Sequence, residues 1–187
     1  MSNVLIIYAS DYGNTKKMAE TIKTGATSVQ GTQVTMKPAE EVTAEDMLAA
    51  DAVIAGTPVH MGSMDWRIKK FIDTVCGGLW MENKMEGKVA AVFATGSGFG
   101  NTGGGAELTL LSMINNFVEL GMIFVPLPKS TPGYPVGGLQ WGPYGRSAGV
   151  NLEQTGVADD SLEAARHHGA HVARVAALVK GKDLFAA

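Results

Sequence analysis

Hydrophobic positions along the chain follow two alternating patterns. Short, continuously apolar runs are typical of strands buried on both faces of a parallel sheet. Between them lie longer segments in which apolar residues recur every three or four positions, as on one face of a helix. The predicted strands are residues 4–8, 33–36, 52–55, 89–94 and 122–127. The predicted helices are residues 14–30, 43–50, 65–75, 106–120 and 159–180.

Strands that alternate with helices predict right-handed crossovers and a doubly wound α/β fold, with helices on both faces of a parallel sheet. Five strands in one domain over residues 1–187 fit the order 2-1-3-4-5. Residues 128–158 show no periodicity but contain Gly, Pro and three aromatic residues. A loop of this length within a compact domain is usually functional or disordered, and the aromatic residues argue for function.

Composition narrows the class of protein. With 45% hydrophobic residues and a net charge of −3, the chain is neither a disordered segment nor a nucleic-acid binder held by bulk charge. One cysteine excludes a disulfide framework, and Cys76 is expected to be a small packed thiol. A basic leader and a long apolar run are both missing, so we expect a cytoplasmic protein. The 24 glycines exceed the usual share of about 7%.

The glycines cluster in loops that follow predicted strands, where open α/β sheets bind their ligands. After the first strand, residues 10–15 lead into a helix whose N-terminal N–H groups, with the hydroxyls of Ser10 and Thr15, suit a phosphate. The segment is neither a Walker A loop nor G-x-G-x-x-G, which disfavours a nucleoside triphosphate or an ordinary dinucleotide. Simple helix capping by Ser10 or Asn14 is the alternative.

The loops after the third and fourth predicted strands are also rich in glycine and suited to bind a ligand. Residues 56–63 combine Pro58 with two glycines in a stiff turn that can present amides to a planar ring. His60 in this turn either hydrogen-bonds a ligand or is an exposed loop histidine. Residues 95–105 contain six glycines in eleven positions, which lets backbone approach a ligand closely. Trp80, after two glycines at the end of the third predicted helix, is either a stacking platform or ordinary packing.

Taken together, these segments resemble the WrbA-like NAD(P)H:quinone oxidoreductases, which are FMN enzymes with a flavodoxin-like fold. The matching stretches are residues 8–15, 56–62, 77–80, 95–105 and 143–145. The resemblance covers essentially the whole chain, and its specificity lies in the order and spacing of the motifs. It implies FMN as cofactor and transfer of two electrons from NAD(P)H to a quinone through flavin N5. His60 and Tyr144 are candidate proton donors, with His60 as the candidate catalytic residue.

The resemblance assigns residues to the parts of this site by position. The FMN phosphate would be held by Ser10, Asp11, Tyr12, Gly13, Asn14 and Thr15. The isoalloxazine ring would be lined by Thr57, Pro58, Val59, His60, Met61 and Gly62. The flavin site would be completed by Thr95, Gly96, Ser97, Gly98, Asn101 and Thr102. The nicotinamide and the quinone would lie near Tyr12, Trp80, Glu119 and Tyr144.

The sequence departs from the family pattern in a few places. His60 stands where the family usually has Arg, and Glu119 where it has a His ahead of the fifth strand. The family's insertion after the second strand is missing, and residues 99–102 are extra in the glycine-rich loop. The first two departures bear on the substrate pocket.

The resemblance also implies partners: NAD(P)H, a quinone or other small electron acceptor, and further copies of the chain in a dimer or tetramer. The alternative is a flavodoxin-type electron carrier without its own NAD(P)H–quinone turnover. The small net charge weighs against a charge-steered carrier, whereas the altered His60 and Glu119 positions weigh for it. A scaffold protein that has lost flavin is disfavoured by the intact glycine loops. No metal site is predicted, because His167 and His171 lack ligand partners in sequence and are expected on an exposed helix face.

Overall fold

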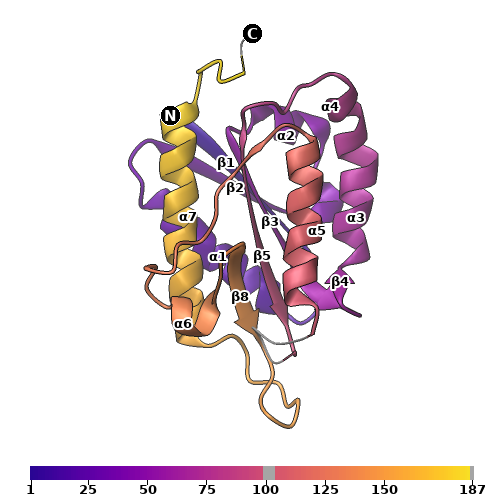
Figure 1. The fold of residues 1–187 in the computed structure, drawn as a ribbon, viewed down its shortest axis with the longest axis vertical. Helices are drawn as coiled ribbons and strands as arrows, with labels where there is room; N and C mark the ends of the chain where they lie inside the picture. Colours follow the sequence, from indigo (N-terminus) through magenta and orange to yellow (C-terminus); the bar gives the residue numbers. More distant parts are fainter. Residues whose placement is uncertain (99–103, 186–187) are drawn as a thin grey trace.

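A parallel sheet forms the centre of the protein in the computed structural model, which describes residues 1–98 and 104–185 (Figure 1). The strands β1 (Ser2–Tyr8), β2 (Thr32–Pro38), β3 (Ala52–His60) and β5 (Val89–Gly96) pair in parallel. Their spatial order is β2-β1-β3-β5, followed by β8 and β7. The predicted doubly wound α/β fold is confirmed, with additional strands.

The last strand of the parallel sheet is built from two separate segments. The strand predicted over residues 122–127 is confirmed only over β6 (Ile123–Phe124), which pairs with the start of β5. The chain then leaves the sheet, forms α6 (Tyr134–Gly137) and β7 (Gly138–Leu139), and returns as β8 (Gly142–Arg146) beside the end of β5. Residues 128–158, predicted as a loop, therefore supply the strand nearest the glycine-rich loop.

Glycine makes β8 possible at this position. A Cβ on Gly142 would lie 2.1 Å from the carbonyl oxygen of Val92, and one on Gly145 would lie 2.5 Å from Sδ of Met18. Only a backbone without side chains fits between β5 and α1 at these points.

Helices cover both faces of the sheet (Figure 1). On one face lie α1 (Asn14–Thr27) and α7 (Asp159–Val179), which approach each other at two glycines, Gly25 and Gly169. On the other face lie α2 (Ala44–Ala49), α3 (Trp66–Phe71) and α5 (Ala106–Glu119), and the short helix η1 (Ala39–Glu41) precedes α2. Among the described residues, none of the helices is long and apolar enough to cross a membrane.

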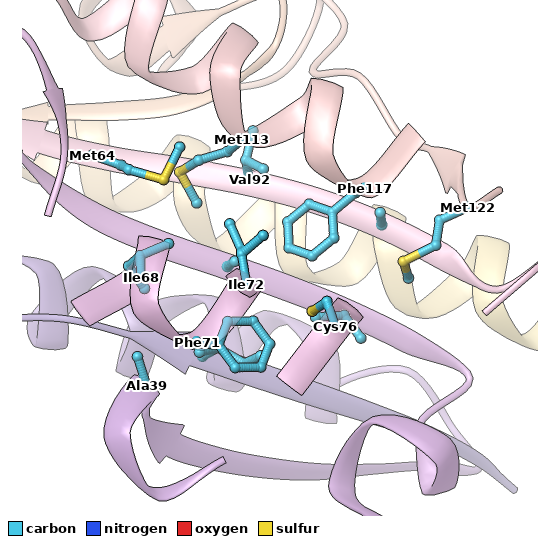
Figure 2. Close-up of a cluster of buried hydrophobic side chains, with 14 of the residues drawn as sticks. Ala39, Met64, Ile68, Phe71, Ile72, Cys76, Val92, Met113, Phe117 and Met122 are labelled. Atoms are coloured by element: carbon cyan, nitrogen blue, oxygen red, sulfur yellow. The ribbon is translucent and has the colours of Figure 1, made fainter. Parts of the chain in front are cut away.

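Each helical layer buries its own apolar cluster against the sheet. Figure 2 shows the cluster on the α3–α5 face, which includes Met113 and Phe117 of α5 and Ile68 and Phe71 of α3. All four side chains are buried, and each such side chain contributes about 1.5–3 kcal/mol by leaving water. The sheet is thus fixed from both sides, which holds the carboxyl ends of its strands in place.

The segment from Trp66 to Met81 is one long helical run, unlike the predicted helix over residues 65–75. After α3 it continues through the π-helical turn η2 (Ile72–Cys76) into α4 (Gly77–Met81). Sixteen residues span about 24 Å at 1.5 Å per residue. The run therefore crosses the sheet from the end of β3 to the opposite edge, where Figure 1 places α4.

Strand β3 also extends further than the predicted residues 52–55. Its last residues turn back in a two-residue hairpin into β4 (Ser63–Met64), with Val59 opposite Met64 and His60 opposite Ser63. The turn residues Met61 and Gly62 both have positive φ, 49° and 78°, as the tight turns that suit twisted hairpins require. The hairpin places His60 beyond the carboxyl edge of the sheet.

Candidate functional site

The loops after β1, β3 and β5 enclose a cavity of about 120 Å³ at the carboxyl edge of the sheet. Its lining comprises Ser10, Asp11, Tyr12, Asn14, Thr15, Pro58, Val59, His60, Thr95, Gly96, Ser97 and Ser147. All of these except Ser147 were predicted from the sequence. Ser147 follows β8 and donates from its backbone N–H to the carbonyl of Gly96 at 2.9 Å. No local sequence pattern predicts this contact.

The first loop leads into α1 in the way a phosphate site requires. Gly13 at the N-cap adopts the left-handed conformation with φ 82° and has no side chain to cap the helix, and the first turn contains no acidic residue. The N-terminal N–H groups and the helix dipole therefore point toward the cavity without a competing carboxylate in that turn. Ser10 Oγ accepts from the N–H of Lys16 at 3.3 Å, so the expected capping role of Ser10 is present as well.

Two buried hydroxyls tie the first and third loops together. Thr15 Oγ1 lies 2.7 Å from Thr95 Oγ1, and both residues are buried. Beneath the second loop, Thr57 is fully buried, and its Oγ1 accepts from the backbone N–H of Asp65 at 2.8 Å. Thr57 thus supports the loop from below rather than lining the cavity. Met61 and Gly62 form the exposed hairpin turn at its rim.

The glycine-rich loop packs by backbone against its neighbours. A Cβ on Gly105 would lie 2.4 Å from Cα of Gly62, and one on Gly96 would lie 3.0 Å from Oη of Tyr144. These glycines bring the third loop close to the hairpin turn and to β8. The predicted site residues Asn101 and Thr102 lie outside the described residues.

Tyr144, predicted to lie near the nicotinamide and the quinone, is not among the residues that line the cavity. It lies in β8, is only 3% exposed, and donates its hydroxyl proton to the carbonyl oxygen of Gly98 at 3.1 Å. Burial raises the pKa of Tyr144 to about 12. The phenol therefore holds the glycine-rich loop from beneath and is poorly placed to give a proton to a substrate.

We expect Tyr144→Phe to weaken FMN binding, because the variant frees the carbonyl of Gly98 and loosens the loop. Loss of one hydrogen bond predicts about 0.5–1.5 kcal/mol, or a roughly 2- to 12-fold higher Kd in a flavin-fluorescence titration. Tyr134→Phe, a half-buried tyrosine of α6, is the matched control. Equal affinity of Tyr144→Phe and wild type would show that the contact does not shape the site.

Trp80 and Glu119 are not brought together with the other predicted residues within one chain. They line a separate groove between α4 and the end of α5, with Cys76 and Asn116, at the edge of the sheet opposite the cavity (Figure 1). The cause is the long helical run from Trp66, which carries Trp80 across the sheet. Cys76 in the same run is buried, and burial raises the pKa of its thiol to about 12, in line with its expected role as a packed thiol.

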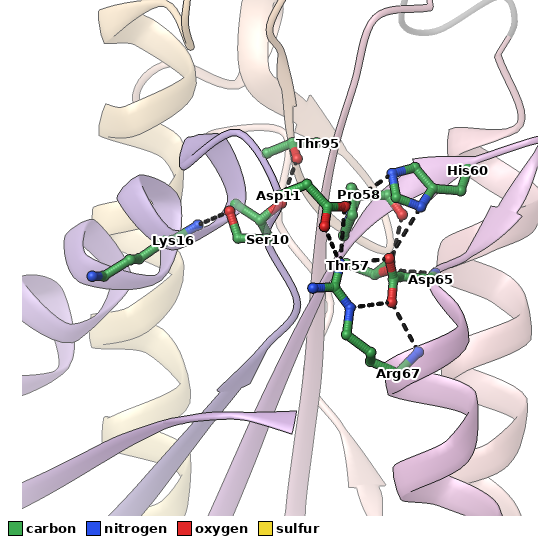
Figure 3. A network of polar contacts seen from close by, with 10 residues as sticks. Ser10, Asp11, Lys16, Thr57, Pro58, His60, Asp65, Arg67 and Thr95 are labelled. Carbon is green, nitrogen blue, oxygen red and sulfur yellow. Dashed lines mark hydrogen bonds and ion pairs between the residues drawn. The ribbon is translucent and has the colours of Figure 1, made fainter. Parts of the chain in front are cut away.

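An ion-pair network stands at the cavity wall beside His60 (Figure 3). Arg67 donates from Nε to Asp65 Oδ1 and from Nη2 to Asp65 Oδ2, each at 2.8 Å. The same Nη2 contacts both carboxylate oxygens of Asp11 at 2.9 Å. His60 completes the network, with Nδ1 at 3.0 Å from Asp65 Oδ2 and Nε2 at 3.5 Å from Asp11 Oδ2.

Asp65 is the buried centre of this network, with 1% of the side chain exposed. Burial opposes its ionisation, but hydrogen bonds from the Arg67 side chain and N–H, with attraction to Arg67 and His60, outweigh burial and lower the pKa of Asp65. The same carboxylate caps α3 by accepting from the N–H of Arg67 at 2.8 Å. The sequence did not predict Asp65 and Arg67 as site residues, because they were interpreted only as the start of a helix.

Asp11, His60 and Asp65 also offer three potential metal-ligand atoms within 4.8 Å of one another. However, the guanidinium of Arg67 already supplies a positive charge between the two carboxylates and occupies oxygens on both. An arginine clamp therefore accounts for the arrangement.

A family model described as "Flavodoxin" matches residues 6–115, more than half of the chain, and this span holds all three strand-end loops. The chain belongs to the flavodoxin family. It is 36% identical to an NAD(P)H dehydrogenase (quinone) of Paraburkholderia phymatum, over 97% of this chain and all of that protein. It is 44% identical to a flavodoxin of Aquifex aeolicus over 63% of this chain, and the match spans 62% of that protein's length.

Among solved structures, this flavodoxin-family chain is similar to the flavodoxin, WrbA-like protein from Agrobacterium tumefaciens. The TM-score is 0.73 at 29% identity, covering 96% of this chain and all of the other. The resemblance seen in the sequence is thereby confirmed.

FMN is the cofactor of this family, and the residues present fit it. The N-terminus of α1, which has glycine at its N-cap, suits the phosphate. Gly96, which has no side chain, lines the cavity and leaves room for a flat ring. The roles of individual residues toward FMN remain predictions.

Proposed function

We propose that the protein is an FMN-dependent NAD(P)H:quinone oxidoreductase. The observation that carries the proposal is the cavity itself, where the loops after three parallel strands meet beside a helix N-terminus whose N-cap residue is glycine. Full-length similarity to a protein named NAD(P)H dehydrogenase (quinone) supports the choice of reaction, because it includes the β6–β8 segment beyond the flavodoxin match. Bound FMN would supply the two-electron chemistry, taking a hydride from NAD(P)H at N5 and passing both electrons to a quinone.

The chain's own residues bind and orient the cofactor and shield it from solvent. The N–H groups at the start of α1 bind the phosphate, with Ser10 and Thr15 as hydroxyl partners. Pro58 and Val59 form one wall for the ring, and Gly96 and Ser97 form the floor. Tyr12, 77% exposed at the cavity mouth, offers an aromatic face against which a nicotinamide or a quinone can stack. His60 is the one half-exposed titratable nitrogen base in the described cavity lining.

We expect anaerobic addition of NADH or NADPH to bleach the yellow absorbance of the FMN-loaded protein, and benzoquinone to restore it. The measurement is a spectroscopic titration with each nucleotide in turn. Dithionite serves as the control, since it reduces bound flavin whatever the protein's substrates are. If dithionite bleaches the bound flavin but neither NADH nor NADPH does, the protein is an electron carrier and the proposed function is wrong.

A further inference from the structure

The network beside the cavity holds one imidazole in a defined orientation. We infer that His60 donates a proton to the electron acceptor, with Asp65 and Arg67 as its positioning residues. This inference rests on the proposed function, which requires a proton as well as a hydride. It assigns the Asp11–His60–Asp65–Arg67 network a role in chemistry rather than in folding alone.

The two ring nitrogens of His60 have different surroundings (Figure 3). Nδ1 lies 3.0 Å from the buried carboxylate of Asp65, while Nε2 lies 3.5 Å from Asp11, which is 41% exposed. The His60 side chain is itself 43% exposed and lines the cavity. Nδ1 is therefore anchored on a buried carboxylate, whereas Nε2 faces an exposed one at the wall of the cavity.

Asp65 is suited to anchor the ring because it stays ionised. Arg67 donates to both carboxylate oxygens of Asp65. Because Asp65 is only 1% exposed, water does not compete with it for the Nδ1–H of His60. This is the arrangement in which a carboxylate fixes the tautomer and orientation of an imidazole base. The charged groups that meet at His60 are Asp11 from the loop after β1 and Asp65 from the start of α3, and Arg67 is bonded to both carboxylates.

The chemistry of quinone reduction defines what His60 has to supply. NAD(P)H releases a hydride, which carries two electrons and one proton, and becomes NAD(P)⁺. A quinone becomes a hydroquinone by gaining two electrons and two protons, so one further proton is needed. The imidazolium of His60 provides it: the Nε2–H bond breaks, an O–H bond forms on the quinone, and the neutral ring keeps its Nδ1–H on Asp65. Water then reprotonates Nε2.

The test separates the two half-reactions in the FMN-loaded protein by anaerobic stopped-flow. In His60→Gln, oxidation by benzoquinone should slow by about 10²-fold more than oxidation by ferricyanide, because ferricyanide takes an electron without a proton and loss of a general acid usually costs about 10²-fold. Reduction by NAD(P)H, which needs no proton donor, should slow far less than oxidation by benzoquinone. A loss shared by all three reactions would reflect the place of His60 in the cavity wall. His167→Gln, on α7, is the matched control.

The positioning residue Asp65 gives a second expected result. Asp65→Asn, which keeps a side chain able to cap α3, should slow benzoquinone but not ferricyanide. If both acceptors slow equally in His60→Gln, or neither slows, the inference is wrong.

A readout independent of turnover is the tautomer of His60, measured by ¹⁵N NMR of histidine-labelled protein. The neutral ring should carry its proton on Nδ1, and an Nε2–H tautomer would contradict the anchoring by Asp65. Failure of the proposed function is distinguishable from failure of this inference. If neither nucleotide reduces the flavin, the dithionite-reduced protein still allows the comparison of benzoquinone with ferricyanide.

Discussion

Arg67→Met is expected to lower the free energy of unfolding of the apoprotein by about 3–5 kcal/mol, because it leaves the buried Asp65 carboxylate without its cation. Four hydrogen bonds from the guanidinium to two carboxylates are lost at once. Asp11 is partly exposed and can be solvated, so most of the penalty falls on Asp65. Urea denaturation monitored by circular dichroism measures the difference.

A double variant separates the lost cation from lost packing. Asp65→Asn in the Arg67→Met background removes the uncompensated charge while retaining a side chain that can cap α3, so at least half of the lost stability should return. Lys69→Met is the control on the same helix, because its ion pair with Asp73 is exposed and should be worth less than about 1 kcal/mol. No recovery in the double variant would show that Arg67 stabilises by packing rather than by charge.

The pH dependence of Arg67→Met follows from the same carboxylate. In the wild type, the lowered pKa of Asp65 contributes stability that is present above the unfolded-state pKa and lost as pH falls through the folded-state pKa. Without Arg67, burial favours the protonated acid, and the variant no longer gains this stability at neutral pH. The difference between variant and wild type should therefore shrink as pH is lowered toward the range in which Asp titrates.

The sheet could be predicted from sequence because β1, β3 and β5 contain continuous apolar runs between amphipathic helices, and β2 alternates apolar and polar residues. The strand β8 could not, because Gly142-Pro143-Tyr144-Gly145-Arg146 has no such run, and its fit depends on close contacts of glycine with Val92 and Met18. The fifth strand was therefore placed entirely in residues 122–127, where only β6 pairs. Contacts between residues far apart in the chain produce no periodic pattern in the sequence, so they cannot be predicted from it.

In the candidate site, too, the part that follows strand ends was predictable and the part that depends on distant contacts was not. The cavity lining was predictable because ligand sites in α/β sheets follow strand ends, and the loops there are short. The Arg67 clamp was not, since its partner Asp11 lies 56 positions away. Within one chain Trp80 lies apart from the cavity, because the helix does not end at the two glycines but continues through Gly77 and Gly78, where nothing lies within 4 Å of an added Cβ.

Acid lability is the second large expected effect, and it originates in α7. His168 is fully buried, and neither ring nitrogen has a hydrogen-bond partner among the described residues. Burial, with a smaller contribution from His171, lowers the pKa of His168 to about 3. The sequence had indicated only an exposed histidine face, yet His167 and His171 are half-buried and His168 faces the core.

The sign of the effect follows from proton uptake. Between the folded-state pKa of about 3 and the unfolded-state pKa near 6.5, only the unfolded chain binds a proton on His168. Stability should therefore fall as pH decreases from 6.5, by up to about 1.4 kcal/mol per pH unit, or nearly 3 kcal/mol by pH 4.5. Urea denaturation of the apoprotein at a series of pH values measures this slope.

His168→Leu tests whether this residue is the source of the slope. The substitution removes two unpaired polar atoms from the core and should be neutral or stabilising at pH 7. It should also flatten the decline between pH 6.5 and 4.5, whereas His167→Gln, at a half-buried position one residue away, should leave most of it. If His168→Leu keeps the wild-type slope, the folded protein binds a proton at this site, and water or a rearranged α7 must solvate the ring.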